Sequence, residues 1–250
     1  MAKAKPKAKP LKFDVLNRLS GKVQFTAEIN CAADARPNVK LGLAVKWAVK
    51  AHANLAHADL AHAYLEDADL ADAYLAGANL EGAYLARANL AGADLARANL
   101  ARANLAHANL ARANLEGADL ARADLAHANL AHAYLAGANL EDAYLSRANL
   151  ADANLADAYL ARANLAGADL IDGGQRSDGY RFVGSIKNGV LMISAGCRHF
   201  SIAAAREHWK HRDGTPLGAE TTCILNHIEE VAVIRSLIPA AKQESRNPTK

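Results

Sequence analysis

The sequence has few of the features that mark secreted or membrane proteins. Only three of its 250 residues are Cys (Cys31, Cys197 and Cys223), and so odd and sparse a set favours reduced thiols over a disulfide framework. No run of about 18 apolar residues is present, which excludes a transmembrane helix. The N-terminus carries charge without an apolar segment, so we expect no signal peptide. These absences predict a cytoplasmic protein without a membrane partner.

The chain also lacks the patterns that indicate an enzyme. No Ser/His/Asp set, phosphate-binding loop or paired carboxylates in a pocket can be identified, and Gly173-Gly174 is typical of a turn. We therefore expect no catalytic residue and no cofactor.

One repeat dominates the chain between Ala53 and Leu170. Every fifth residue there is Leu, 24 times without exception, and an Ala precedes each Leu by two places. The residue between them is always Asn, Asp or Tyr. On a helix a period of five is about 140° out of phase per repeat, and on a flat strand it sends successive Leu to opposite faces. The period therefore predicts a chain that bends once per repeat, with each Ala-x-Leu pointing inward.

Repeats such as Ala53-Asn54-Leu55-Ala56-His57 and Ala98-Asn99-Leu100-Ala101-Arg102 resemble the pentapeptide repeat family, over about half of the chain. The resemblance implies an all-β dominated fold, a right-handed quadrilateral β-helix of about six coils, with four repeats per coil about 4.8 Å apart. Leu55, Leu110 and Leu170 are expected on its axis as structural residues. Burial of each Leu stabilises the fold by about 1.5–3 kcal/mol.

The segments before the repeat suggest a tail and a cap. Residues 1–12 alternate Lys with Ala and Pro, which predicts a disordered basic tail. Residues 13–50 are expected to cap the coil, since an uncovered first coil would expose a strand edge. This cap is predicted to hold a strand at 23–29 and a helix at 39–50, or else an imperfect first coil. Trp47 is expected to cover the first Leu layer.

The segment after the repeat, residues 171–240, predicts a ββαα module, followed by a disordered tail at 241–250. Strands are expected at 180–184 and 190–194, joined through Asn188-Gly189. Ser201 is a plausible N-cap for a helix at 202–209, and apolar spacing predicts a second helix at 222–238. The module is well placed to cap the C-terminal end of the coil.

Charge is distributed unevenly. Residues 1–50 hold eleven basic and three acidic residues, a net +8, while 51–170 hold seven Arg, no Lys and fifteen acidic residues, a net −8. The basic tail could bind nucleic acid weakly, but with no aromatic residue among its few Lys we favour a solvated tail. Direct nucleic-acid binding elsewhere is not expected.

Function must lie on outward positions, because Leu fills the interior. With a 20-residue coil, Tyr64, Tyr84 and Tyr144 share one face, and His107 stacks with His127. Asn89, Asn109, Asn129 and Asn149 are expected to form a hydrogen-bonded column, and stacked Arg102 and Arg122 to pair with Asp119 and Asp124. The predicted interaction surface consists of Tyr64, Tyr84, Tyr144, Asp67, Asp69 and Asp72.

Metal binding is the weaker interpretation of the histidines and cysteines. In the repeat, His52, His57 and His62 fall on different sides, and His107 with His127 lacks a third ligand. The C-terminal module offers two Cys and four His, without the spacing of a standard zinc ribbon or finger. The candidate zinc ligands there are Cys197, His199, His208, His211, Cys223 and His227.

Two functions remain open. The first is a non-catalytic scaffold that binds an as yet unidentified protein through its outer columns. The second follows from the resemblance, because some family members are acidic, DNA-mimicking rods that bind DNA gyrase. The net −8 agrees in sign, although residues 86–130 hold five Arg and four acidic residues and are nearly neutral.

Overall fold

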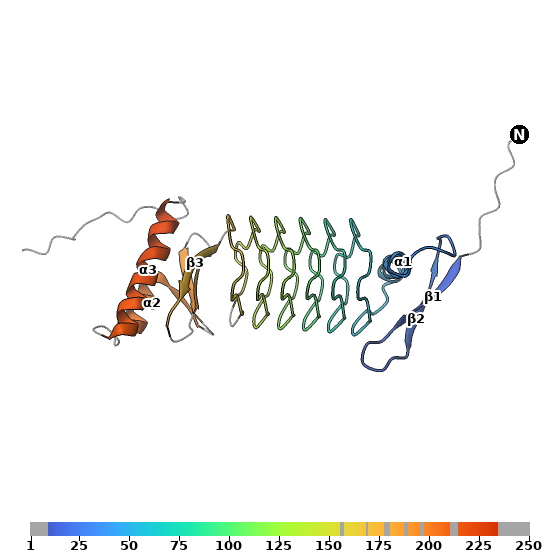
Figure 1. Ribbon diagram of the computed structural model, residues 1–250, viewed down its shortest axis with the longest axis horizontal. Coiled ribbons are helices and arrows are strands. Elements are labelled where there is room, and N and C mark those ends of the chain that lie inside the picture. The colour runs from blue at the N-terminus through green and yellow to red at the C-terminus, as the bar shows by residue number, and fades with distance from the viewer. Residues whose placement is uncertain are drawn as a thin grey trace, which may run out of the picture. The chain divides into compact units, whose positions relative to one another are not determined.

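The computed structural model describes residues 10–155, 158–168, 170–177, 181–187, 190–195, 198–210 and 215–234. Contacts divide the chain into two compact units, with the division between Ala168 and Asp169. The first unit holds β1, β2, α1 and the repeats, and the second holds β3 to β6, α2 and α3 (Figure 1).

An antiparallel hairpin opens the first unit. β1 (Leu11–Leu16) pairs with β2 (Val23–Ile29), from Leu11 opposite Ile29 to Leu16 opposite Val23. The alternation at 23–29 predicted β2. β1 was not predicted, and it begins inside the segment assigned to the disordered tail, so that boundary was wrong. β1 also alternates apolar with polar residues, and pairing with β2 orders it. Residues 1–9 lie outside the described residues.

The helix α1 (Pro37–Lys50) lies on the first coil. It begins two residues earlier than predicted, because Pro37 suits the first turn of a helix. Tyr64 N–H donates to the Asn38 carbonyl at 3.0 Å, and a Cβ on Gly42 would overlap the Tyr64 carbonyl. Trp47 is half-buried and stacks on Phe25, with ring centroids 6.4 Å apart. That Trp47 covers the first Leu layer stays a prediction.

The repeats stack with a register of 20 residues. Parallel bridges join the Asn, Asp or Tyr of a repeat to its counterpart 20 positions later, from Asp59–Asn79 to Tyr144–Asn164. Four pentapeptides therefore make one coil, and 24 repeats make six coils (Figure 1). Each extended piece is so short that it contributes single-residue bridges, and of the strands β1 to β6 only β3 touches the repeats, at its first residue, Leu170.

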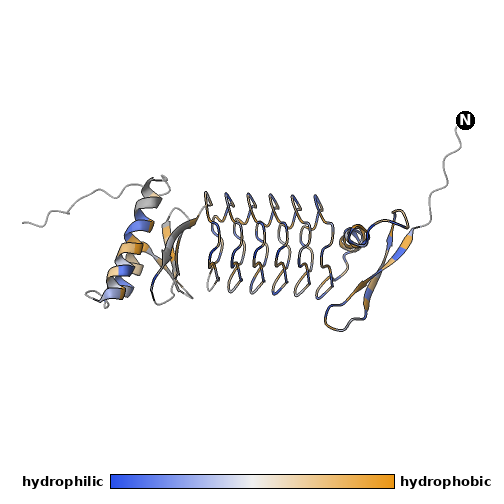
Figure 2. Ribbon diagram, viewed as in Figure 1, coloured by the Kyte–Doolittle hydropathy of each residue, from blue (hydrophilic) through white to orange (hydrophobic). Residues whose placement is uncertain are grey.

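Leu fills the interior of these coils. No Leu of the repeats is more than 7% exposed, and Leu55, Leu110 and Leu170 are almost completely buried. The inward Ala are also buried at nearly every described repeat. Apolar and polar residues alternate along each coil, as Figure 2 shows. The predicted inward direction of Ala and Leu is therefore confirmed.

The second unit contains a four-stranded antiparallel sheet in the order β3-β4-β5-β6. Its strands are β3 (Leu170–Gln175), β4 (Arg181–Lys187), β5 (Val190–Ala195) and β6 (Arg198–Ser201). Two strands were predicted, so the ββαα description was incomplete. Gly173-Gly174 lies in β3 at a register shift rather than in a turn. Gly173 allows a close approach, because a Cβ there would overlap Ile228.

Two helices pack against the sheet of this unit. α2 (Ile202–Trp209) begins after Ser201, whose hydroxyl accepts the Ala204 N–H at 3.3 Å, as predicted. α3 (Pro216–Ile234) begins six residues earlier than predicted, and residues 235–250 lie outside the described part of the chain. The buried core of the unit consists of Phe182, Leu191, Ile193, Ala195, Ala205, Trp209, Leu225, Ile228 and Ala232.

Candidate functional site

The corner of each repeat is a tight turn that sets the direction of the outward side chains. At the Leu60 repeat, the Ala63 N–H donates to the Leu60 carbonyl at 3.1 Å, and His62 between them has φ of 59°. A hydrogen-bonded turn with positive φ at its third residue is a type II turn, which favours Gly there. Yet 17 described non-Gly residues, all His, Asp or Arg, adopt this conformation. Polar side chains thus occupy corners that backbone sterics would leave to Gly.

The outward Asn and Asp also hold the chain in its bend. The Oδ1 of Asn99 accepts the N–H of Ala101, two residues later, at 3.1 Å, and the same contact recurs at other repeats. Asx turns of this kind are a local reason for Asn and Asp at bends. Tyr is the third residue type at this position and lacks the short acceptor, so its ring projects outward instead.

The four pentapeptides of a coil form four faces, which we name after their first Leu: the Leu55, Leu60, Leu65 and Leu70 faces. The predicted Asn column lies on the Leu70 face and is confirmed. Asn109 donates to Asn89 at 3.1 Å, Asn129 to Asn109 at 3.2 Å and Asn149 to Asn129 at 3.2 Å. Asp69 accepts from Asn89 at 3.0 Å and begins the column. The column is structural.

The Leu65 face contains the predicted tyrosines. Tyr64 and Tyr84 lie in adjacent coils with ring centroids 6.0 Å apart, and Tyr144 lies three coils beyond Tyr84 in the same column. Both the Glu66 and Asp67 carboxylates bind Arg87, each at 2.7 Å. The sequence analysis did not identify Arg87, although its spacing of 20 residues from Asp67 would have revealed the pair.

Hydrogen bonds shift the pKa values of Tyr64, Asp67 and Arg87 in this cluster, and that of Arg87 is raised by its bond to Asp67. The Tyr64 hydroxyl donates to Glu66 at 2.7 Å, and this bond to a carboxylate raises the pKa of Tyr64. The Arg87 guanidinium, through its hydrogen bond, holds the pKa of Asp67 below its usual value. Tyr64, Tyr84 and Asp67 therefore form one polar and aromatic patch.

Asp69 and Asp72, the other acidic residues of the predicted surface, lie on the Leu70 face rather than beside the tyrosines. Asp69 is used by the Asn column, and the Asp72 carboxylate lies over Gly92, where a Cβ would overlap it. The structure thus divides the six predicted interaction residues between two faces. Whether they bind a partner stays a prediction.

The stacked histidines are where they were predicted. His107 and His127 lie in adjacent coils of the Leu65 face, with ring centroids 4.7 Å apart and nearly parallel planes. No group of three or more potential metal ligands occurs among the described residues. Of the zinc candidates in the second unit, Cys223 and His227 are exposed on α3, and His208 stacks on Phe200. Cys197 and His211 lie outside the described residues, as does the side chain of His199.

Arg102 and Arg122 stand one above the other on the Leu60 face. They do not pair with Asp119 or Asp124 as predicted. Arg102 approaches Glu81 and Arg122 approaches Asp142, both at 3.7 Å. The prediction failed because Asp119 and Asp124 accept N–H groups of their own bends, and Asp119 also accepts from Asn139.

The end of this face resembles the Arg87 cluster. Arg162 binds Asp142 at 2.7 Å and Glu141 at 2.6 Å. The Arg162 hydrogen bond holds the pKa of Asp142 below its usual value. Two shallow grooves flank the Arg pair. One has a volume of about 430 Å³ and includes Tyr144 and Ser146, and the other, of about 370 Å³, includes the acidic residues.

A dry interior, a 20-residue register and outward polar columns define a repeat protein built as a coil. The pentapeptide repeat model matches eight copies, at residues 51–85, 83–122 and 138–172. The chain belongs to the pentapeptide repeat family, whose members form right-handed quadrilateral β-helices. No curated protein matches the chain. Within the described residues, no helix has the length and apolar character needed to cross a membrane.

Three solved structures illustrate the likeness. Rfr23, a pentapeptide repeat protein from the cyanobacterium Cyanothece 51142, is 41% identical, with a TM-score of 0.31 over 36% of this chain. HetL from Nostoc sp. strain PCC 7120, involved in heterocyst differentiation regulation, is 34% identical, with a TM-score of 0.25 over 47% of this chain. Full-length QnrB1, a plasmid-mediated fluoroquinolone resistance protein, is 18% identical, with a TM-score of 0.26 over 44%. The chain spans 58% of Rfr23, 68% of HetL and 66% of QnrB1.

Proposed function

We propose that the protein is a non-catalytic scaffold that binds another protein through the outward columns of its right-handed coil. The observation that carries this proposal is the filled interior, since every Leu of the repeats is buried. Side chains that bind a partner must therefore lie outside the coil, as in other repeat proteins with extended binding surfaces. Catalysis would need a cleft with converging polar groups. The grooves beside Arg102 and Arg122 are shallow surface features.

The Tyr64 and Tyr84 patch is the best candidate for the contact. Tyr and Arg are both enriched in protein interfaces and among the residues that contribute most to binding. Arg87 holds Glu66 and Asp67 in fixed positions, so a partner would meet an ordered surface. Cys31 and Cys223 are free thiols, which supports a reducing compartment such as the cytoplasm.

The experiment is affinity capture with matched tyrosine variants. Tyr64→Ser with Tyr84→Ser removes the paired rings, and Tyr74→Ser with Tyr134→Ser removes two exposed rings from the Leu55 face. A protein captured by the wild type should be lost with the first variant and retained with the second. Equal retention by both variants would contradict a contact at Tyr64 and Tyr84.

The alternative is a DNA-mimicking protein that binds gyrase or another topoisomerase. The net −8 of residues 51–170 supports it. Several carboxylates are neutralised by Arg87 and Arg162, which breaks the negative surface that a DNA mimic needs. Inhibition of gyrase supercoiling by the full chain would favour this alternative, and no inhibition at excess protein would exclude it.

A further inference from the structure

Arg102 and Arg122 are the only two arginines of the repeats that lie 20 residues apart. The 20-residue positions on either side of the other repeat arginines within the coils hold Asp, Gly or His. Like charges directly opposite each other on neighbouring strands are destabilising. The Arg pair is therefore an exception that the stability of the coil does not require.

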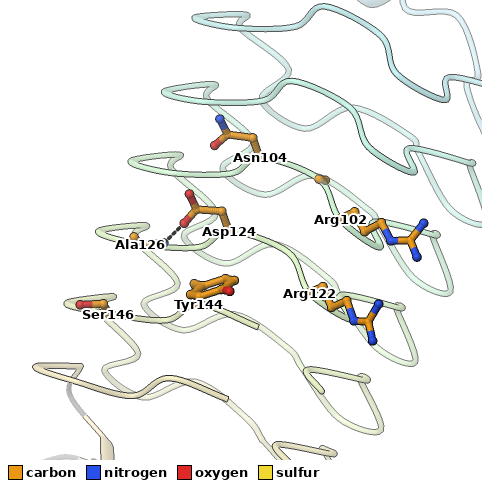
Figure 3. A pocket seen from close by; sticks show the side chains of 8 residues that line it. Arg102, Asn104, Arg122, Asp124, Ala126, Tyr144 and Ser146 are labelled. Carbon is orange, nitrogen blue, oxygen red and sulfur yellow. Dashed lines mark hydrogen bonds between the residues drawn. The ribbon is translucent and has the colours of Figure 1, made fainter. Parts of the chain in front are cut away.

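The coil holds these two side chains in parallel. The Arg102 N–H donates to the Ala121 carbonyl at 2.9 Å, beside the Asn104–Asp124 bridge, so both side chains start from adjacent coils in register. Figure 3 shows the two guanidinium groups side by side and pointing in the same direction. Their side chains are 64% and 61% exposed. A single ligand can therefore reach both groups.

The acidic neighbours hold these arginines loosely. The distances of 3.7 Å to Glu81 and Asp142 exceed the 2.7–2.9 Å that is usual for a charge-assisted hydrogen bond. Asp142 is bound more closely by Arg162, at 2.7 Å. A guanidinium has five N–H donors. Arg102 and Arg122 thus retain N–H donors for a ligand. In Arg87 and Arg162, by contrast, N–H donors are closely bound to carboxylates.

The groove of about 430 Å³ adds polar groups next to the pair. It is lined by Arg102, Arg122, Asn104, Tyr144 and Ser146, with Asp124 as its one acidic side chain. Ser146 is the only Ser that follows a Leu in the 24 repeats, where Ala or Glu is otherwise usual. Asn104, Tyr144 and Ser146 lie along the Leu65 face, and the two guanidinium groups extend from the edge of this face and point away from them (Figure 3).

We propose that Arg102 and Arg122 bind a phosphomonoester dianion. A phosphoryl group offers three strong acceptor oxygens and nearly two negative charges at pH 7, and planar guanidinium groups bind it through paired hydrogen bonds. Glu81 lies at one end of the pair and Asp142 at the other, and the groove of about 370 Å³ beside the pair also includes Asp119 and Glu141. These carboxylates disfavour an extended polyanion such as DNA more strongly than a single compact dianion that contacts only the two guanidinium groups.

The same chemistry has two sources, a phosphorylated Ser or Thr of a protein and a free phosphate compound. Isothermal titration of the full chain with inorganic phosphate, phenyl phosphate and a phosphoserine peptide tests both. We expect saturable binding with a dissociation constant of about 1 mM or lower. Tighter binding of the peptide than of inorganic phosphate would assign the site to a phosphoprotein, and the reverse order to a free compound.

Matched variants distinguish binding at this site from non-specific attraction to positive charge elsewhere on the chain. Arg102→Gln and Arg122→Gln should each weaken binding by at least about tenfold. Arg112→Gln removes an isolated arginine from the Leu70 face and should leave binding unchanged, with thermal unfolding confirming that all three variants fold. No saturation by about 10 mM, or an equal loss in Arg112→Gln, would overturn the proposal. This inference does not depend on the Tyr64 and Tyr84 contact.

Discussion

At the scale of the residue, the outward Asn has two structural roles, because it holds the bend of its own repeat and links neighbouring coils. Asn109 donates its amide to Asn89 and accepts both the amide of Asn129 and the N–H of Ala111. One side chain therefore fixes its own bend and ties three coils together. Asp at this position keeps the acceptor and loses the donor, so Asp69 can accept from Asn89, whereas Asp119 interrupts the donor chain of its column although it accepts from Asn139.

Substitution of Asn109 tests these two structural roles separately. Asn109→Asp removes the single bond to Asn89 and should lower the free energy of unfolding by about 1 kcal/mol. Asn109→Ala removes all three bonds and should cost about 2–3 kcal/mol. Urea unfolding followed by circular dichroism measures both. Equal costs for the two variants would show that the donor alone matters.

The Arg87 cluster leads to a prediction about how the stability of the fold depends on pH. Since the folded pKa of Asp67 lies below 3.8, the ion pair stabilises the fold above that pH and is lost as pH falls through the lower folded value. Arg87→Gln should move the pKa of Asp67 back up toward 3.8. Carbon NMR of the carboxyl groups follows this titration. Arg112→Gln is the control. An unchanged pKa of Asp67 in Arg87→Gln would rule out the Arg87 hydrogen bond as the cause of the shift.

At the scale of the element, the junction between α1 and the first coil depends on one glycine. Gly in a helix normally costs about 1 kcal/mol relative to Ala. At Gly42 the sign should reverse, because an added Cβ would overlap the Tyr64 carbonyl, and backbone atoms on both sides restrict any shift. The helix would have to move away from the coil that it covers.

Gly42→Ala should therefore lower the melting temperature, where an ordinary helical position would show an increase. Lys50→Ala, at the exposed end of the same helix, provides the control. Differential scanning calorimetry measures both variants. A higher melting temperature for Gly42→Ala would mean that α1 does not pack as closely as the structure indicates.

The sequence predicted the elements whose pattern is periodic. The 20-residue columns, including His107 over His127, follow from the period of five and the four-repeat coil. β1, β3 and β6 were missed because their order comes from pairing with β2, β4 and β5, which lie elsewhere in the chain. The partners of Arg102 and Arg122 were also missed, since a long side chain reaches into the adjacent coil.

At the scale of the whole molecule, the two units are stabilised in different ways. The coil relies on repeated Leu burial and on backbone bonds between successive coils, so each coil contacts mainly its neighbours. The second unit has a compact core around Phe182 and Trp209, whose ring centroids lie 5.2 Å apart. Side chains that bind a partner along the coil must come from its outer columns.

The comparison of Leu110→Asp with Arg112→Asp tests this account most directly. The two positions are two residues apart, but Leu110 is fully buried and Arg112 lies at an outward corner. Asp occurs naturally at that corner in the same column, as Asp72 and Asp152. In thermal unfolding, Arg112→Asp should change stability by less than about 0.5 kcal/mol, whereas Leu110→Asp should prevent cooperative folding of the repeats. An unchanged melting temperature for Leu110→Asp would contradict the account.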